Sequence, residues 1–380
     1  MAAEKHRFLA LDGLRGVAAA MVLATHIGDV GHRVTIISHG YLAVDLFFVL
    51  SGFVIASAYE RRLNDSRRPI RDMIRARLTR LYPMMALGAL VGLAAMGLGA
   101  ERDGQLSIWP ALASQLTFAP ILRPRTDLFV LDTVAWSLML ELAVNLLHAA
   151  VLRRLSTRVI AVLAALSLAP LVWVAWRFQG LDVGWCYESW LGGLARVAFS
   201  YLTGLGLYRL YAAGRGPRIS APAPLLLAAA PAALLLQYLP IQHASVVCDL
   251  ASVILLYPVL VWCAARVKLV GRSATLATLA GTISYPLYAL QLPLAHIFQS
   301  DLASGITLQI GGPLAWTAFA VAMVALAAFV ARYYDGPVRN WIAGGRRLRN
   351  AGDRALSPQG LGSPGPESGQ WQPSRAWPLD

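Results

Sequence analysis

Two apolar segments near the start of the chain carry side chains that a lipid environment would exclude. Residues 11–28 and 40–53 are rich in Leu, Val, Ala and Phe, and they contain four ionisable residues, which are Asp12, Arg15, His26 and Asp45. An ionisable group at membrane depth is costly unless it is paired or faces a polar cavity. The first hypothesis is therefore a functional site built by these two segments.

The spacing of Arg15 and His26 places both side chains on one helical face. They are eleven positions apart, which is close to three full turns and about 16 Å along the axis of an α-helix. A stripe of this kind indicates a lined pathway or an active site. The alternative is that the Arg reaches the membrane surface along its aliphatic stem and the His simply ends the helix.

Long apolar segments must position these residues. The 380 residues are 57% hydrophobic and only 14% charged, and the mean hydropathy is +0.56, values typical of a polytopic membrane protein. Because a helical span needs about 20 apolar residues, we predict an all-α bundle of about ten transmembrane helices. The segments are too long and too uniformly apolar for barrel strands. The predicted spans are 8–28, 41–59, 78–99, 132–152, 158–176, 191–211, 222–239, 245–265, 275–298 and 312–332.

The distribution of basic residues predicts the orientation of these helices. The formal net charge of +13 could suggest nucleic acid as a partner, but 26 of the 33 Lys and Arg residues fall in alternate segments that share one side of the bundle, and five fall on the other side. Since basic loops stay in the cytoplasm, we expect the N- and C-termini to be cytoplasmic in a bacterial inner membrane. We expect contacts with membrane lipids and no nucleic-acid partner.

The domain organisation is expected to be simple. Residues 1–343 form the transmembrane domain, and residues 344–380, which are rich in Gly, Pro, Ser and Arg, are expected to be a disordered cytoplasmic tail. No soluble catalytic domain is expected, so any chemistry must come from the helices and their loops. The loop 176–190 combines aromatic residues with Asp182 and Glu188, which fits an aromatic belt at the membrane surface or a platform for carbohydrate.

Six segments of the chain, in order, resemble the acyltransferase-3 family of bacterial membrane acyltransferases. The resemblance covers residues 8–340, and its first three motifs are specific at this spacing. The segments are LDGLRGVAAAMVLATH, VDLFFVLSGFVIA, RARLTRLYP, VAWSLMLE, RVAFSYLTGLGLY and SYPLYALQLPL.

The resemblance implies a reaction and its substrates. Members of this family transfer acyl groups, most often acetyl, from a cytoplasmic donor to hydroxyls of glycans. We therefore expect acetyl-CoA or another acyl-CoA as co-substrate, no permanently bound cofactor and no metal. The expected acceptor is a cell-surface or exported polysaccharide, another glycan or a lipid-linked saccharide. The resemblance also implies that Arg77 and Arg80 match the donor-binding Arg-x-x-Arg motif. Arg suits phosphate because its guanidinium donates two parallel hydrogen bonds.

His26 is the expected catalytic centre. Neutral imidazole titrates near working pH, so it can take the proton of an alcohol as a general base, or it can carry the acyl group transiently as a nucleophile. Arg15 is expected to bind the donor or to stabilise anionic charge, although pairing with Asp12 would also explain it. Asp45 is expected to orient His26, with structural pairing to Arg33 or a backbone amide as the alternative.

Other residues of the motifs have competing interpretations. Glu141 lies within an apolar span and is a site candidate for that reason. Ser51 and Gly52 fit a nucleophile less well than a small pair that permits close helix packing. Gln291 departs from the family pattern, in which a His often precedes the Pro, so no role is assigned to that position.

A multi-span transporter or exporter is the rival class, since buried charges in a helical bundle also suit ion or solute coupling. Transporters often contain two halves with broken helices in corresponding positions. The span 222–239, which contains Pro222, Pro224 and Pro231, has no clear counterpart. An acyltransferase that acts on a lipid or a small molecule is the third possibility.

Overall fold

The computed structural model is helical in the part of the chain that it describes, which is residues 8–30, 39–64, 70–98, 107–217, 221–233, 243–300 and 312–342. Within those ranges the only strand-type pairing is a single bridge between Asp127 and Cys186. The fold class is therefore all-α, as the composition predicts. The expected tail, 344–380, lies outside the described residues.

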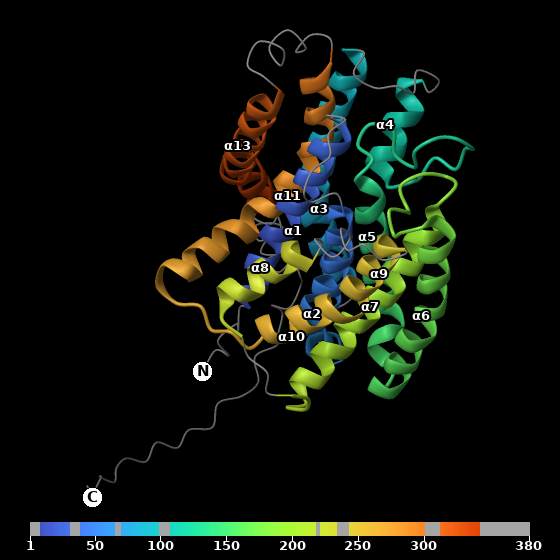
Figure 1. Cartoon of the computed structure of the whole chain (residues 1–380), viewed down its shortest axis with the longest axis vertical. Helices are drawn as coiled ribbons and strands as arrows, with labels where there is room; N and C mark the ends of the chain where they lie inside the picture. The colour runs from blue at the N-terminus through green and yellow to red at the C-terminus, as the bar shows by residue number, and fades with distance from the viewer. Residues whose placement is uncertain are drawn as a thin grey trace, which may run out of the picture. The chain divides into compact units, whose positions relative to one another are not determined.

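The helices follow the predicted apolar segments closely (Figure 1). The first half of the chain contains α1 (Leu9–Val30), η1 (Gly40–Leu42), α2 (Ala43–Asn64), α3 (Ile70–Gly97), α4 (Ile108–Thr117), α5 (Ala135–Ala150), η2 (Leu152–Arg154) and α6 (Thr157–Phe178). The second half contains α7 (Trp190–Ala212), α8 (Ala223–Ala233), α9 (Ala244–Ala251), η4 (Ser252–Leu256), α10 (Tyr257–Ala264), α11 (Gly271–Gln299), α13 (Gly312–Val330) and η5 (Ala331–Asp335).

Six stretches are long and apolar enough to cross a membrane. They comprise α1, η1 with α2, α3, α6, α9 through α10, and α13 with its continuation to Ile342. Helices also occupy the other four predicted spans, but α5 and α8 are short, and α7 and α11 are long without meeting the same apolarity. The structure thus supports a polytopic membrane protein, and the count of ten spans stays a prediction.

Helix α2 packs against α7 at backbone distance because both helices carry a glycine at the crossing. A Cβ atom added to Gly52 would lie 2.3 Å from the carbonyl oxygen of Tyr201, and one added to Gly204 would lie 2.0 Å from that of Val49. No side chain larger than hydrogen fits either place without moving a helix. The small-residue interpretation of Gly52 is therefore correct, and this crossing fixes α2 relative to α7.

Substituting Gly52 with Ala is expected to destabilise the bundle. The added methyl group forces α2 and α7 apart, which costs about 1–3 kcal/mol in a well-packed interior. Thermal unfolding of the detergent-purified protein measures the effect. Gly206→Ala is the matched control, because a Cβ there meets nothing within 4 Å and Ala favours the helix. Equal stability of the two variants would contradict this packing.

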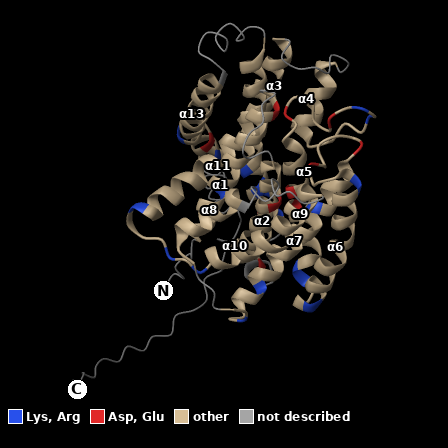
Figure 2. Ribbon diagram, in the orientation of Figure 1, with Lys and Arg blue, Asp and Glu red and all other residues tan. Residues whose placement is uncertain are grey.

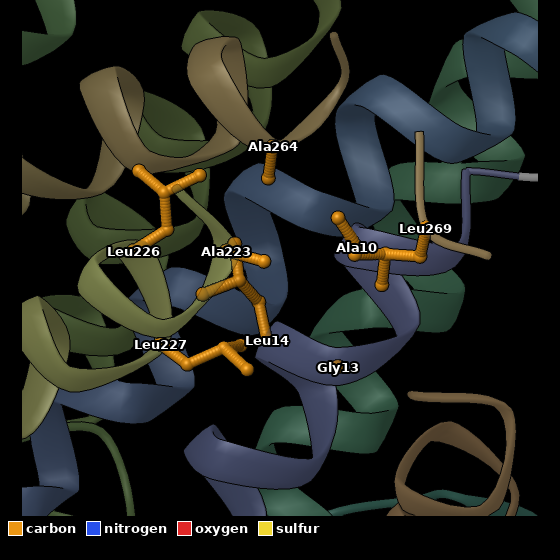
Figure 3. A pocket seen from close by; sticks show the side chains of 8 residues that line it. All are labelled: Ala10, Gly13, Leu14, Ala223, Leu226, Leu227, Ala264 and Leu269. Carbon is orange, nitrogen blue, oxygen red and sulfur yellow. The ribbon is translucent and has the colours of Figure 1, made fainter. Parts of the chain in front are cut away.

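Two cavities on the described part of the bundle are lined by apolar side chains. Figure 3 shows a small one where α1 meets α8, α10 and Leu269. A larger groove of about 600 Å³ lies between α1, α11 and α13, with residues such as Leu23, Ile283 and Val324 along it. These surfaces offer no group for chemistry, so the polar interior is where the candidate site must be sought.

Candidate active site

Three helices bring an arginine cluster together, which we define as Arg15 on α1, Arg77 and Arg80 on α3, and Glu141 on α5. An Nη2 nitrogen of Arg77 donates to Oε1 of Glu141 at 2.5 Å, and Oγ of Ser51 donates to the same oxygen at 3.0 Å. Arg15 and Arg80 lie within electrostatic range of that carboxylate. Four residues from three motifs, each expected to serve a site, therefore meet in one place.

The arginine cluster has more positive charge than its carboxylate can balance. Arg77 is ion-paired with Glu141, and Arg15 and Arg80 lie within electrostatic range of the same carboxylate. Asp12 neighbours Arg15, and Asp335 neighbours Arg80. Within the described ranges, the Nε atoms of Arg15 and Arg77 are buried and have no hydrogen-bond partner. Buried donors in native proteins are normally paired, so these two N–H groups are available to an anionic or strongly polar ligand.

His26 lies three turns further along α1 than Arg15, about 16 Å from it along the axis. Its Nδ1 atom is buried and lacks a hydrogen-bond partner in the part of the chain that the structure describes. His296 on α11 is within electrostatic range of it. Sequence reasoning missed His296, because a His near the end of an apolar helix gives no signal by itself.

Asp45 does not orient His26, contrary to the expectation from sequence. Its carboxylate is fully buried and pairs with Arg196 on α7, whose Nη2 and Nε atoms donate to Oδ2 at 2.7 and 3.0 Å. Ser200 donates to Oδ1 at 3.3 Å. A guanidinium satisfies a buried carboxylate with both charge and two hydrogen bonds, which explains why Asp45 faces α7.

Arg196 also holds the loop ends around it. Its Nη1 donates to the carbonyl oxygen of Val183 and its Nη2 to that of Tyr41, both at 2.9 Å. The guanidinium carbon lies 5.3 Å from the centre of the Trp136 ring. Four segments thus meet at one buried cation. The sequence did contain a signal for this ion pair. An Arg inside an apolar span needs a counter-ion, and Asp45, in another apolar span, could supply it.

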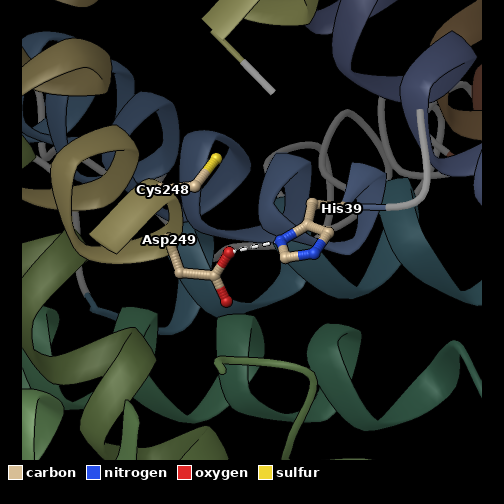
Figure 4. A group of neighbouring side chains, drawn as sticks. All are labelled: His39, Cys248 and Asp249. Carbon is tan, nitrogen blue, oxygen red and sulfur yellow. Dashed lines mark hydrogen bonds and ion pairs between the residues drawn. The ribbon is translucent and has the colours of Figure 1, made fainter. Parts of the chain in front are cut away.

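A second polar group, the Asp249 cluster, consists of His39, Tyr41 and Asp249; Figure 4 shows His39 and Asp249 facing each other, with Cys248 beside them. Nδ1 of His39 is 2.6 Å from Oδ1 of Asp249, and the Tyr41 hydroxyl donates to Oδ2 at 2.9 Å. The backbone amide of Leu181 also donates to Oδ2, at 2.7 Å. The cluster therefore fastens the segment before α2, the loop after α6 and helix α9 together.

Two neighbours extend the Asp249 cluster. The sulfur of Cys248 and the candidate ligand atoms of His39 and Asp249 all lie within 4.8 Å of one another, although the short contact between His39 and Asp249 has the length of a hydrogen bond. Burial raises the pKa of the nearby Asp182 carboxyl above its ordinary value, and Arg196 opposes that shift. No sequence motif indicated this cluster.

The motifs VAWSLMLE and SYPLYALQLPL meet beside α2. The Ser137 and Tyr288 hydroxyls lie 2.6 Å apart, and the Tyr288 ring packs edge-on against the Phe47 ring with 5.6 Å between their centres. One turn beyond Tyr288, Gln291 is fully buried. Helices α5 and α11 thus both place polar side chains in the interior.

Comparisons with known proteins agree with the sequence motifs. A family model described as an acyltransferase domain, Acyl_transf_3, matches residues 8–332. Over 160 residues the chain is 38% identical to "Protein 2 in picA locus" of Rhizobium radiobacter, which covers 38% of this chain and 81% of that protein.

A second relative is the acyltransferase MdmB of Streptomyces mycarofaciens, 31% identical over 148 residues, or 36% of this chain and 37% of that protein. No solved structure matches the chain significantly. The family match spans all the helices that build the arginine cluster and carry His26. By that match, the chain belongs to the acyltransferase-3 family.

Proposed function

We propose that the protein is a membrane O-acyltransferase that moves an acyl group, with acetyl as the expected one, from a cytoplasmic acyl-CoA to a hydroxyl of a cell-surface or exported glycan. The observation that carries this proposal is the arginine cluster, in which Arg77 is ion-paired with Glu141 and Arg15 and Arg80 lie within electrostatic range of the same carboxylate. One member of this cluster, Arg15, lies on the same helix as His26.

Coenzyme A fits the arginine cluster because it carries several phosphates. Guanidinium groups bind phosphate through paired, charge-assisted hydrogen bonds. The unpartnered Nε–H groups of Arg15 and Arg77 can donate such bonds to phosphate oxygens. With its phosphates held there, the long arm of the donor extends along α1. The thioester would then approach His26, about 16 Å away along the helix.

The transfer step needs one base, which takes the acceptor proton and returns it to the leaving thiolate. The acceptor hydroxyl oxygen attacks the acyl carbonyl carbon while His26 takes the hydroxyl proton. The carbon–sulfur bond then breaks, coenzyme A leaves as the thiolate, and the proton passes from His26 to that sulfur. If His26 instead carries the acyl group, an imidazole nitrogen attacks first and the acceptor attacks the acyl-imidazole afterwards.

Charge placement supports entry of the donor from the cytoplasm. Figure 2 shows basic residues at the lower ends of α6 and α7, where Arg153, Arg154 and Arg158 precede or begin α6 and Arg209 ends α7. Basic helix ends remain in the cytoplasm. We therefore propose an inner-membrane location with both termini in the cytoplasm.

Replacing Arg77 and Arg80 together with Gln is expected to raise the KM for acetyl-CoA at least tenfold. The acceptor KM should change little, because the acceptor meets His26 at the far end of α1. Lys at both positions should restore only part of the affinity, since an ammonium keeps the charge and loses the paired hydrogen bonds. Initial rates in membranes at varied acetyl-CoA concentration measure both constants.

The matched control for this pair is Arg71→Gln with Arg75→Gln, two arginines one or two turns earlier on α3. This control removes the same positive charge from the same helix end. If the basic residues only set helix orientation, both double variants should behave alike, and correctly inserted Arg77/Arg80 protein should keep its donor KM. That result would remove these residues from the donor site.

The acceptor is tested by mass spectrometry of surface glycans from cells with and without the protein. We expect ester-linked acyl groups on one glycan to disappear when the protein is absent. Unchanged glycans together with a newly unmodified lipid or small molecule would move the acceptor to that class, while donor binding at the arginine cluster would stand.

A further inference from the structure

Gln291 is a buried amide without a partner. Its side chain is 0% exposed, and neither Nε2 nor Oε1 has a hydrogen-bond partner among the residues that the structure describes. A buried amide that makes no hydrogen bond is costly, and in a membrane bundle water is scarce. A site that keeps such a group open is one in which a ligand supplies the missing partner.

The packing of α1 against α11 sets the position of Gln291 relative to His26. A Cβ atom added to Gly16 would lie 2.5 Å from Cβ of Ala280, and one added to Gly13 would lie 3.6 Å from Cβ of Ala277. From the Gly13 contact to the Gly16 contact the residue numbers rise on both helices, so α1 and α11 run in the same direction, as Figure 1 shows. A Cβ atom added to Gly281 would lie 2.7 Å from Cβ of Asp12, so these contacts together give the register between the helices to within one or two turns.

Counting from that contact brings the two residues to one level. His26 lies ten residues beyond Gly16, and Gln291 lies eleven residues beyond Ala280. At about 1.5 Å per residue, His26 and Gln291 lie about 15 and 16 Å along their helix axes from this contact. Pro286 lies within the intervening part of α11. His296, one or two turns further on, is within electrostatic range of His26, in agreement with this register.

The neighbouring polar groups do not satisfy Gln291. Tyr288, one turn earlier on the same helical face, has its hydroxyl 2.6 Å from Oγ of Ser137. His26 has an unpartnered Nδ1 of its own. Two buried polar side chains at one level of adjacent helices thus both lack partners, which is the arrangement expected where the reacting groups of a substrate bind.

We infer that Gln291 is a catalytic residue whose Nε2–H group binds the acyl carbonyl oxygen and stabilises the oxyanion that forms during transfer. This inference rests on the proposed function. As the acceptor oxygen adds to the carbonyl carbon, the pair of electrons of the carbonyl bond moves onto the oxygen, and a fixed amide donor then binds it more strongly than before. No proton is transferred to or from Gln291.

An amide suits this role beside an imidazole. It donates a hydrogen bond at every physiological pH, and it cannot compete with His26 for the acceptor proton because it does not titrate. Its Oε1 atom is left to accept from an N–H or O–H group of the substrate. The oxyanion is created only during the reaction, so the Gln291 donor should act on kcat and leave donor binding almost unchanged.

The test compares Gln291→Met with wild type in kinetics and in stability. Met has a similar length and no donor, so kcat should fall about 100-fold, the usual effect of losing one oxyanion donor. The KM for acetyl-CoA should stay within about twofold. The thermal unfolding temperature should stay equal or rise, because an apolar side chain removes an unsatisfied amide. Gln291→Glu should lose rate as well, since a carboxylate only accepts hydrogen bonds and repels the oxyanion.

Leu287→Met, one turn away on α11 and buried among apolar side chains, is the control and should leave kcat unchanged. If Gln291→Met keeps more than one-third of the wild-type kcat, or if it loses rate only in proportion to lost folded protein, Gln291 is not the donor. Wild-type membranes that transfer no acyl group from acetyl-CoA would instead overturn the proposed function, and this inference with it.

Discussion

Replacing His26 with Ala should abolish acyl transfer while the protein still inserts and folds. Loss of a general base typically costs about 100-fold or more in rate, and loss of an acyl carrier should cost at least as much. Folding should suffer little, because Nδ1 of His26 makes no hydrogen bond in the described structure. Initial rates in membranes, normalised to the amount of folded protein, measure the effect.

His243→Ala is the control for His26. His243 is the exposed residue that precedes α9, and its Nδ1 lies 3.1 Å from Oε1 of Gln179. Its loss should leave transfer unchanged. An acyl-enzyme trapped by acid quenching in wild type and absent from His26→Ala would identify the carrier role, and its absence the base role. More than about one-tenth of the wild-type rate in His26→Ala would remove His26 from the chemistry.

Replacing Asp45 with Ala should lower the free energy of unfolding by about 3–5 kcal/mol, the usual cost of leaving one charge of a buried ion pair without its partner. Arg196 is 1% exposed and would keep its charge in an apolar interior. Without Asp45 to fix the guanidinium, Arg196 would also lose its hydrogen bonds to the carbonyl oxygens of Tyr41 and Val183. Unfolding of the purified protein in detergent, followed by heat or denaturant, measures the change.

The combined variant Asp45→Leu with Arg196→Met tests whether the pair acts as a unit. Removing both charges should recover most of the lost stability, because apolar residues of similar size replace buried ion pairs at little cost. If Asp45→Ala is as stable as wild type and has lost transfer alone, Asp45 is part of the chemistry. In that case the structural role described above is wrong.

Sequence reasoning found the helices because apolar runs of about 20 residues are a strong signal. It also found Arg15 and Glu141 as charges in apolar segments, and Arg77 and Arg80 through the resemblance to the family's Arg-x-x-Arg motif. It did not predict that they form a single cluster. The ion pair between α3 and α5 joins Arg77 and Glu141, which are 64 positions apart, and no local pattern records such long-range neighbours.

The errors have physical causes as well. Asp45 was expected beside His26 because both lie near the same ends of adjacent helices, but the Gly52 and Gly204 crossing turns α2 towards α7 and Arg196. Gln291 received no role because it stands where the family often has a His before the Pro. Only its complete burial without a partner distinguishes it. The span count depends on α7 and α11, whose polar faces weaken their apolar signal.

The most direct measurement of the central claim follows the acyl group itself. Washed membranes that contain the protein are incubated with acetyl-CoA labelled in the acetyl group, and the saccharide fraction is then extracted. The proposed function predicts label in an alkali-labile ester with the wild-type protein and none with His26→Ala. A transporter would move label across vesicles without forming an ester. Equal ester label with and without His26, or no ester label in wild type, would contradict the account.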